Sequence, residues 1–99
     1  MTKFWENSTV HSFYGDDTTM DTTRCEVRIG DGRISVTYEY EPGKFQTYEG
    51  SEVGQWHFNL KAKEGDGKAN LHCFPDRRVL DGWWAEEGHE GMWRIILNE

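Results

Sequence analysis

The chain has 99 residues, with 18 acidic and 11 basic side chains and a net charge of −7. This length suits one domain, which we place over residues 1–99. The negative charge argues against a nucleic acid or an anionic membrane surface as partner, because both require a basic patch. It suits a basic protein partner instead. Five Trp, five Phe and four Tyr provide a dense core for so short a chain, since each ring can bury about 150–250 Å².

The first 23 residues show a weaker pattern than the rest of the chain. Residues 8–14 can form a strand, and the polar segment 15–23 then serves as a crossover loop. The sequence contains neither the apolar segment of a signal peptide nor a run of about 20 apolar residues. We therefore expect a cytoplasmic protein.

Large apolar residues recur at every second position from about Arg24 to Leu97. The clearest segments each open with a glycine and span 54–60, 67–73 and 91–97. A period of two is typical of a strand with one buried face and one solvent-exposed face. The sequence therefore predicts an antiparallel sheet with tryptophans on its inner face.

Asp31-Gly32 is the strongest hairpin signal in the chain, because this dipeptide favours the type I′ turn between adjacent antiparallel strands. A turn at this point places apolar residues opposite one another on one face. The predicted pairs are Ile29 with Ile34, Val27 with Val36 and Cys25 with Tyr38.

Two further turns are predicted in the middle of the chain. Residues 41–44 have the proline and glycine of a four-residue loop, and residues 50–53 form the next loop. Both loops keep aromatic residues on the buried face. The predicted pairs are Tyr40 with Phe45, Tyr38 with Thr47, Thr47 with Trp56 and Phe45 with Phe58.

Three late turns, at 64–67, 75–78 and 87–90, complete the meander. They again bring apolar residues together on one face, and they place Trp83 opposite Arg94 on the outer face. The inner pairs are Leu60 with Leu71, Phe58 with Cys73, Ala69 with Trp84, Leu71 with Gly82, Cys73 with Leu80, Trp84 with Trp93 and Leu80 with Leu97.

These turns predict an all-β fold, an antiparallel up-and-down meander of seven to eight strands. An open sheet would expose two edges, which favour aggregation. A strand at residues 8–14 would allow closure, and eight strands enclose just enough space for side chains or one small ligand. We therefore expect a closed or nearly closed small barrel.

The predicted meander contains three Gly-x-Trp motifs at the starts of strands: Gly54-Gln55-Trp56, Gly82-Trp83-Trp84 and Gly91-Met92-Trp93. In these motifs and in its predicted topology, the segment 24–97 resembles the calycins, the lipocalin- and avidin-type small β-barrels. The resemblance implies that a small molecule binds inside the barrel.

The inner aromatic residues are the main candidate site. They can line an apolar pocket with polar tips, which is the usual composition of a ligand site. They can equally fill the core of a short barrel. The candidate ligand-binding residues are Tyr38, Tyr40, Trp56, Phe58, Trp84 and Trp93.

The outer face offers a second candidate, an interface around Trp83 and Arg94. An outward indole beside a guanidinium can serve a partner surface or form a surface cation–π pair. We therefore weigh two functions: a binder of a small apolar or aromatic molecule, and an acidic interaction module of the inhibitor or immunity type that masks a basic partner.

Catalysis, metals and cofactors receive little support from the sequence. It contains no nucleophile elbow and no phosphate-binding glycine loop, so an enzyme is the third alternative. His57 and His72 fall near each other on the outer face, but a third metal ligand is missing, and we expect no metal and no cofactor. Cys25 and Cys73 are expected to be buried thiols, with a disulfide as the alternative.

Overall fold

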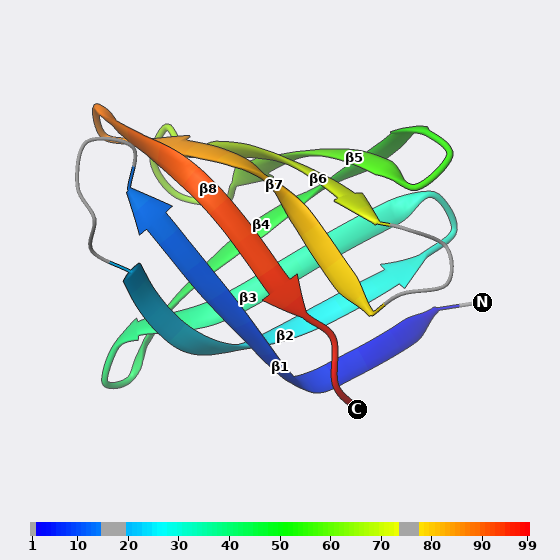
Figure 1. Cartoon of the computed structure of the whole chain (residues 1–99), viewed down its shortest axis with the longest axis horizontal. Coiled ribbons are helices and arrows are strands. Elements are labelled where there is room, and N and C mark those ends of the chain that lie inside the picture. The colour runs from blue at the N-terminus through cyan, green and yellow to red at the C-terminus, as the bar shows by residue number, and fades with distance from the viewer. Residues whose placement is uncertain (1, 15–19, 74–77) are drawn as a thin grey trace.

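The chain forms a closed antiparallel barrel of eight strands, in which each strand pairs with the next and β8 pairs with β1 (Figure 1). The computed structural model describes residues 2–14, 20–73 and 78–99, and this part of the chain contains no helix. The predicted fold class is therefore confirmed. The strands are β1 (Lys3–Tyr14), β2 (Met20–Gly30), β3 (Arg33–Glu41), β4 (Lys44–Gly54), β5 (His57–Ala62), β6 (Lys68–Cys73), β7 (Val79–Glu86) and β8 (His89–Ile96).

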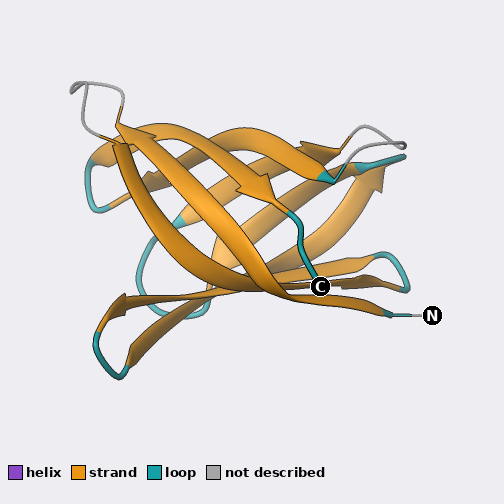
Figure 2. Cartoon of the chain, turned by 60° about the horizontal axis from the view of Figure 1, so that its bottom comes forward, coloured by secondary structure: helices purple, strands orange, loops and turns teal. Residues whose placement is uncertain are grey.

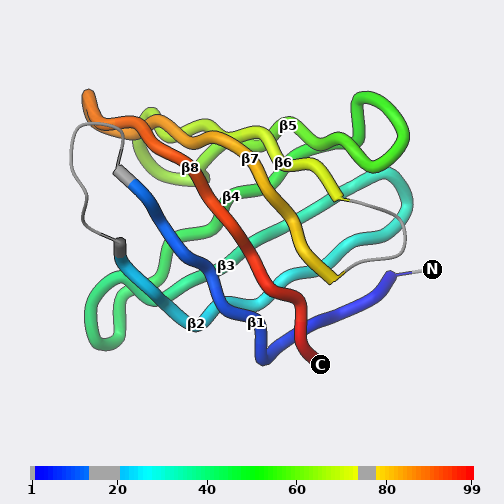
Figure 3. Tube along the Cα trace, in the orientation of Figure 1, coloured from blue at the N-terminus to red at the C-terminus, as the bar shows by residue number. Residues whose placement is uncertain are grey.

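The N-terminal strand is longer than predicted and closes the barrel. It begins at Lys3 rather than Ser8, and a register shift between Trp5 and Ser8 divides it in two. The first part pairs with β2, whereas Thr9–Phe13 pairs with both β2 and β8. The tube in Figure 3 follows the bend between the two parts. The predicted loop at 15–23 is shorter, because β2 begins at Met20, and residues 15–19 lie outside the described residues.

The β2–β3 hairpin has the predicted register. Ile29 faces Ile34, and Val27 faces Val36. Asp31 and Gly32 both adopt positive φ angles, of 55° and 75°. This is the backbone of a type I′ turn, whose twist matches that of the flanking strands.

The β3–β4 register differs from the prediction by one residue. Glu41 pairs with Lys44 across a tight Pro42-Gly43 turn, and a bulge between Glu39 and Glu41 brings Tyr38 opposite Gln46. A slip of one residue reverses the faces of a strand. Tyr48 therefore enters the core, while the rings predicted to lie inside are exposed. Tyr40 is 55% exposed and Phe45 is 60% exposed. The hairpin that carries them projects from the barrel (Figure 2).

The predicted loop at 50–53 is part of a strand instead. β4 continues to Gly54, so the turn falls at Gln55 and Trp56. Trp56 is thus a turn residue with a φ of 64° and does not pair with Thr47. A positive φ is rare for a bulky side chain. The regular alternation of residues 54–60 concealed this turn.

The later hairpins keep the predicted inner face. In β6–β7, Ala69 faces Trp84 and Cys73 faces Leu80, as predicted, although residues 75–77 of that turn lie outside the described residues. The β5–β6 and β7–β8 registers are shifted by two residues. A shift of two preserves the face, because side chains alternate with that period. The observed pairs include Phe58 with Leu71, Leu60 with Ala69, Gly82 with Trp93, Trp84 with Gly91 and Leu80 with Ile95.

The centre of the barrel is filled by side chains. Every strand contributes at least one buried apolar residue, so the middle holds a packed core rather than a channel. Within the described residues, no helix is long and apolar enough to span a membrane. The core comprises Val10, Cys25, Val27, Ile34, Val36, Tyr48, Phe58, Leu60, Ala69, Leu71, Leu80, Trp84, Trp93, Ile95 and Leu97.

Candidate functional site

Open space remains at the two ends of the barrel. One cavity, of about 760 Å³, lies where β3 and β7 end, and we call it the Trp84 mouth. Another, of about 530 Å³, lies where β2 and β4 end, and we call it the Trp56 mouth. The packed core separates the two mouths.

The structure divides the six predicted ligand-binding residues between these mouths. Four of them line the Trp84 mouth and two line the Trp56 mouth, so they do not form one pocket. The aromatic residues predicted to line one barrel interior therefore line two separate cavities. The first group is Tyr38, Tyr40, Trp84 and Trp93, and the second is Trp56 and Phe58.

Three inward-facing aromatic residues, Tyr38, Trp84 and Trp93, form what we call the aromatic floor of the Trp84 mouth. Trp84 and Trp93 are only 6% and 4% exposed. The Tyr38 and Trp93 rings lie 6.1 Å apart at 84°, and Tyr48 packs edge-on against Trp93 at 4.9 Å. Such edge-to-face contacts are favourable and fix ring orientation. The floor is therefore built by rigid strand residues.

The wall of the Trp84 mouth carries polar groups, of which Glu86 is the most informative. It follows Leu80, Gly82 and Trp84 on the inner face of β7 and is only partly exposed. Gln46 donates one hydrogen bond to a Glu86 carboxylate oxygen at 3.5 Å and another to the carbonyl of Glu64 at 3.0 Å. Glu86 is not among the predicted site residues, although the alternation of β7 extends to it.

Acidic side chains predominate at this mouth. Its described lining includes four carboxylates and one histidine, His89, but neither a lysine nor an arginine. Burial raises the pKa of the Tyr48 phenol, and the negative charge of Glu86 raises it further. The carboxylates are Asp21, Glu64, Glu86 and Glu87.

The folded protein should lose stability at alkaline pH because of Tyr48. An unfolded tyrosine ionises near pH ~10, whereas folded Tyr48 keeps its proton above that pH. The native state then binds more protons, so the free energy of unfolding should fall by up to about 1.4 kcal/mol per pH unit above pH ~10.

Urea unfolding at about pH 8 and about pH 11 checks this linkage. Tyr48→Phe should lose less stability between the two pH values than the original protein. Tyr40→Phe is the matched control, because that ring is exposed on the β3–β4 hairpin. Equal losses in all three proteins would contradict the role of Tyr48.

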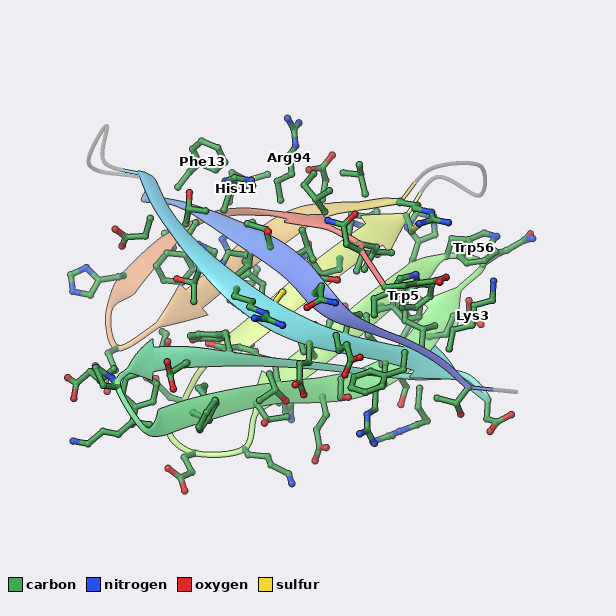
Figure 4. All side chains as sticks on the ribbon, turned by 90° about the horizontal axis from the view of Figure 1, so that it is seen from below. Lys3, Trp5, His11, Phe13, Trp56 and Arg94 are labelled. Atoms are coloured by element: carbon green, nitrogen blue, oxygen red, sulfur yellow. The ribbon has the colours of Figure 1, made fainter. Side chains whose placement is uncertain are left out.

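The Trp56 mouth is smaller and electrically mixed. Trp5, Trp56 and Phe58 line it together with Lys3 and Arg78 and with three carboxylates. Figure 4 shows Lys3, Trp5 and Trp56 at the same end of the barrel. The Trp56 amide donates a hydrogen bond to the Glu52 carboxylate at 3.1 Å, and the Trp56 carbonyl accepts one from the Cys73 amide at 3.0 Å. These bonds hold the positive-φ turn in place.

The predicted pairing of Trp83 with Arg94 on the outer face is wrong. Trp83 faces Met92, and Arg94 faces Asp81, to which it donates at 2.9 Å in an ion pair. The two-residue register shift in β7–β8 is the reason. Trp83 is more exposed than Trp84, as predicted. Met92 on β8 is the cross-strand neighbour of Trp83, and Phe13 on β1 is the next neighbour beyond Met92. Figure 4 shows Phe13 and Arg94 pointing away from the barrel.

The histidine pair and the cysteines form no further centre among the described residues. His57 and His72, predicted to lie near each other, are direct cross-strand partners joined through their Nδ1 atoms. No group of three or more described His, Cys, Asp or Glu side chains could hold a metal ion. Neither Cys25 nor Cys73 forms a disulfide. Burial, and then Glu26, raise the pKa of the Cys25 thiol to about 12.

Comparison with known proteins gives no relative from which a function could be transferred. No protein-family model matches the chain, and no curated protein or solved structure shows significant similarity to it. The structure itself shows a small closed antiparallel β-barrel. The two mouths and the outer face are therefore the candidate binding surfaces of this protein.

Proposed function

We propose that this protein is a non-catalytic binder that holds a small molecule in the Trp84 mouth. The observation that carries the proposal is a cavity of about 760 Å³ with an aromatic floor and a few polar groups on its wall. Ligand sites typically have volumes of about 300–1,000 Å³ and this mixture of surfaces. In the floor, Trp84 and Trp93 are already buried and Tyr38 is partly buried, so binding requires little ordering.

Binding through one open end of the barrel would be calycin-like. In that arrangement, strands hold the contact residues rigidly and turns surround the entrance. We propose a cytoplasmic location, because a buried thiol such as that of Cys25 suits a reducing compartment.

In the alternative function, an interaction module, the protein would bind its partner through an outer apolar strip of Trp83, Met92 and Phe13. Met92 is 53% exposed and Phe13 is 39% exposed. The nearby charges of Arg94 and Asp81 neutralise each other in an ion pair, so the strip lacks the negative charge that would attract a basic partner. We therefore favour the Trp84 mouth.

Blocking the mouth should abolish binding without unfolding the barrel. Ser12 faces inward on β1 opposite Trp93 and lines the cavity, so Ser12→Phe would fill it. His11→Phe is the matched control, because it adds the same ring to the outer face of the same strand. The probes are soluble aromatic fragments such as indole and 2-phenylethanol.

Indole N–H resonances in NMR spectra report which mouth is occupied. We expect the fragments to shift the Trp84 and Trp93 resonances in the original protein and in His11→Phe, but not in Ser12→Phe. The Trp5 and Trp56 resonances should remain in place. The proposal fails if no fragment shifts Trp84 and Trp93, or if Ser12→Phe binds as well as the original protein.

A further inference from the structure

The Trp84 mouth combines aromatic rings with uncompensated negative charge. Resting on the proposed function, we propose that its ligand is a small organic cation, an amine or quaternary ammonium group. Four carboxylates and the rings of Tyr38, Tyr40, Trp84 and Trp93 line the cavity, and no described lining residue is a lysine or an arginine. A ligand of this class would supply the positive charge that the mouth lacks.

The rings of the aromatic floor form a corner rather than a stack. Tyr38 and Trp93 meet at 84°, with 6.1 Å between their centroids, and Trp84 lines the same cavity. Cations are attracted to aromatic faces within about 6 Å of the ring centroid, most strongly to tryptophan and next to tyrosine. Perpendicular rings can contact an ammonium group from two sides, as in the aromatic cages that bind methylated amines.

Glu86 is the lining carboxylate that lies on the same strand as Trp84. It stands one inward position beyond Trp84 on β7 and is partly shielded from solvent. The neutral amide of Gln46 donates a hydrogen bond to it. The described ion pairs, Lys44–Glu41 and Arg94–Asp81, lie elsewhere. No described ion pair therefore compensates this carboxylate, and limited solvent access strengthens its attraction for a cation.

The cation requirement distinguishes this mouth from the other end of the barrel. The Trp56 mouth has comparable aromatic residues, but Lys3 and Arg78 lie among its carboxylates. Its charge is thus partly compensated within the protein. An organic cation should accordingly select the Trp84 mouth.

Three matched probes test the charge of the ligand: 2-phenylethylamine, 2-phenylethanol and phenylacetate. They share one ring and differ in carrying a positive, a neutral or a negative group at neutral pH. By calorimetry and tryptophan NMR, the amine should bind at least about tenfold more tightly than the alcohol, because charge-assisted contacts are about twice as strong as neutral ones. Phenylacetate should bind most weakly, and added salt should weaken only the amine.

Glu86→Gln keeps the size and hydrogen bonding of the side chain while removing its charge. We expect about tenfold weaker binding of the amine and unchanged binding of the alcohol, which also shows that the mouth is intact. Glu26→Gln is the control, since Glu26 is exposed on β2 and does not line the cavity. This variant should bind all three probes like the original protein.

The outcomes separate this inference from the proposed function. Equal binding of the amine and the alcohol, or an amine affinity unchanged in Glu86→Gln, overturns the cation proposal and leaves the mouth as a neutral binding site. The proposed function itself falls if none of the three probes and none of the neutral fragments shifts the Trp84 and Trp93 resonances, or if Ser12→Phe binds as well as the original protein.

Discussion

Trp93→Ala should lower the free energy of unfolding by about 3–5 kcal/mol, the cost of removing a buried tryptophan and leaving a cavity. Trp93 is almost fully buried, and its ring contacts both Tyr38 and Tyr48. Removing the ring leaves Tyr38 and Tyr48 facing the space that it occupied. Urea unfolding at neutral pH measures the loss, and Trp84→Ala should behave similarly.

Trp83→Ala is the matched control for both variants. Trp83 lies on the same strand as Trp84, but its side chain is on the outer face and is only partly buried. Its replacement should change stability by less than about 1 kcal/mol. A loss below that value for Trp93→Ala, or an equal loss for Trp83→Ala, would mean that the inner face has been assigned wrongly.

Gly82→Ala should destabilise the barrel by more than about 3 kcal/mol, at the upper end of single substitutions. A Cβ at Gly82 would lie 1.7 Å from the carbonyl oxygen of Asn70 and 3.0 Å from the Cα of Leu71. Both atoms belong to the backbone of β6, so relief requires the two strands to separate. Thermal unfolding followed by circular dichroism gives the change.

Gly54→Ala shows whether this cost comes from the close approach or from losing any strand glycine. A Cβ at Gly54 would meet only the His57 side chain, at 3.7 Å, which is ordinary contact. We expect a change within about 0.5 kcal/mol. Similar losses in the two variants would refute the account based on strand proximity.

The sequence predicted which face of most strands is buried better than it predicted which residues pair. Leu60 can lie opposite Leu71 or Ala69 with equal burial of apolar surface, so alternation does not distinguish registers two residues apart. In β4 even the face was ambiguous, because Phe45 and Tyr48 offer an aromatic residue on each side. The bulge before Glu41, which decided the outcome, has no signature in the apolar pattern.

The candidate site was predictable only in part for a related reason. The aromatic floor of Tyr38, Trp84 and Trp93 follows from alternation, because all three occupy inward positions. Trp56 lies apart from this floor because it adopts a positive φ angle, which a bulky side chain rarely does and which alternation does not predict. Glu86 lies on the inner face at the very end of β7, where a charged residue is more often assigned to the following turn.

The filled centre of the barrel makes each mouth a blind cup. A molecule in the Trp84 mouth cannot pass through to the opposite end, so it must leave by the opening through which it entered. Its residence time then depends on the rim, which includes Tyr40, Gly65 and Glu87, as well as on the floor. Related ligands of one site usually differ more in dissociation rate than in association rate. The turns that surround the entrance are therefore where this fold could adjust how long a ligand is retained without altering its core.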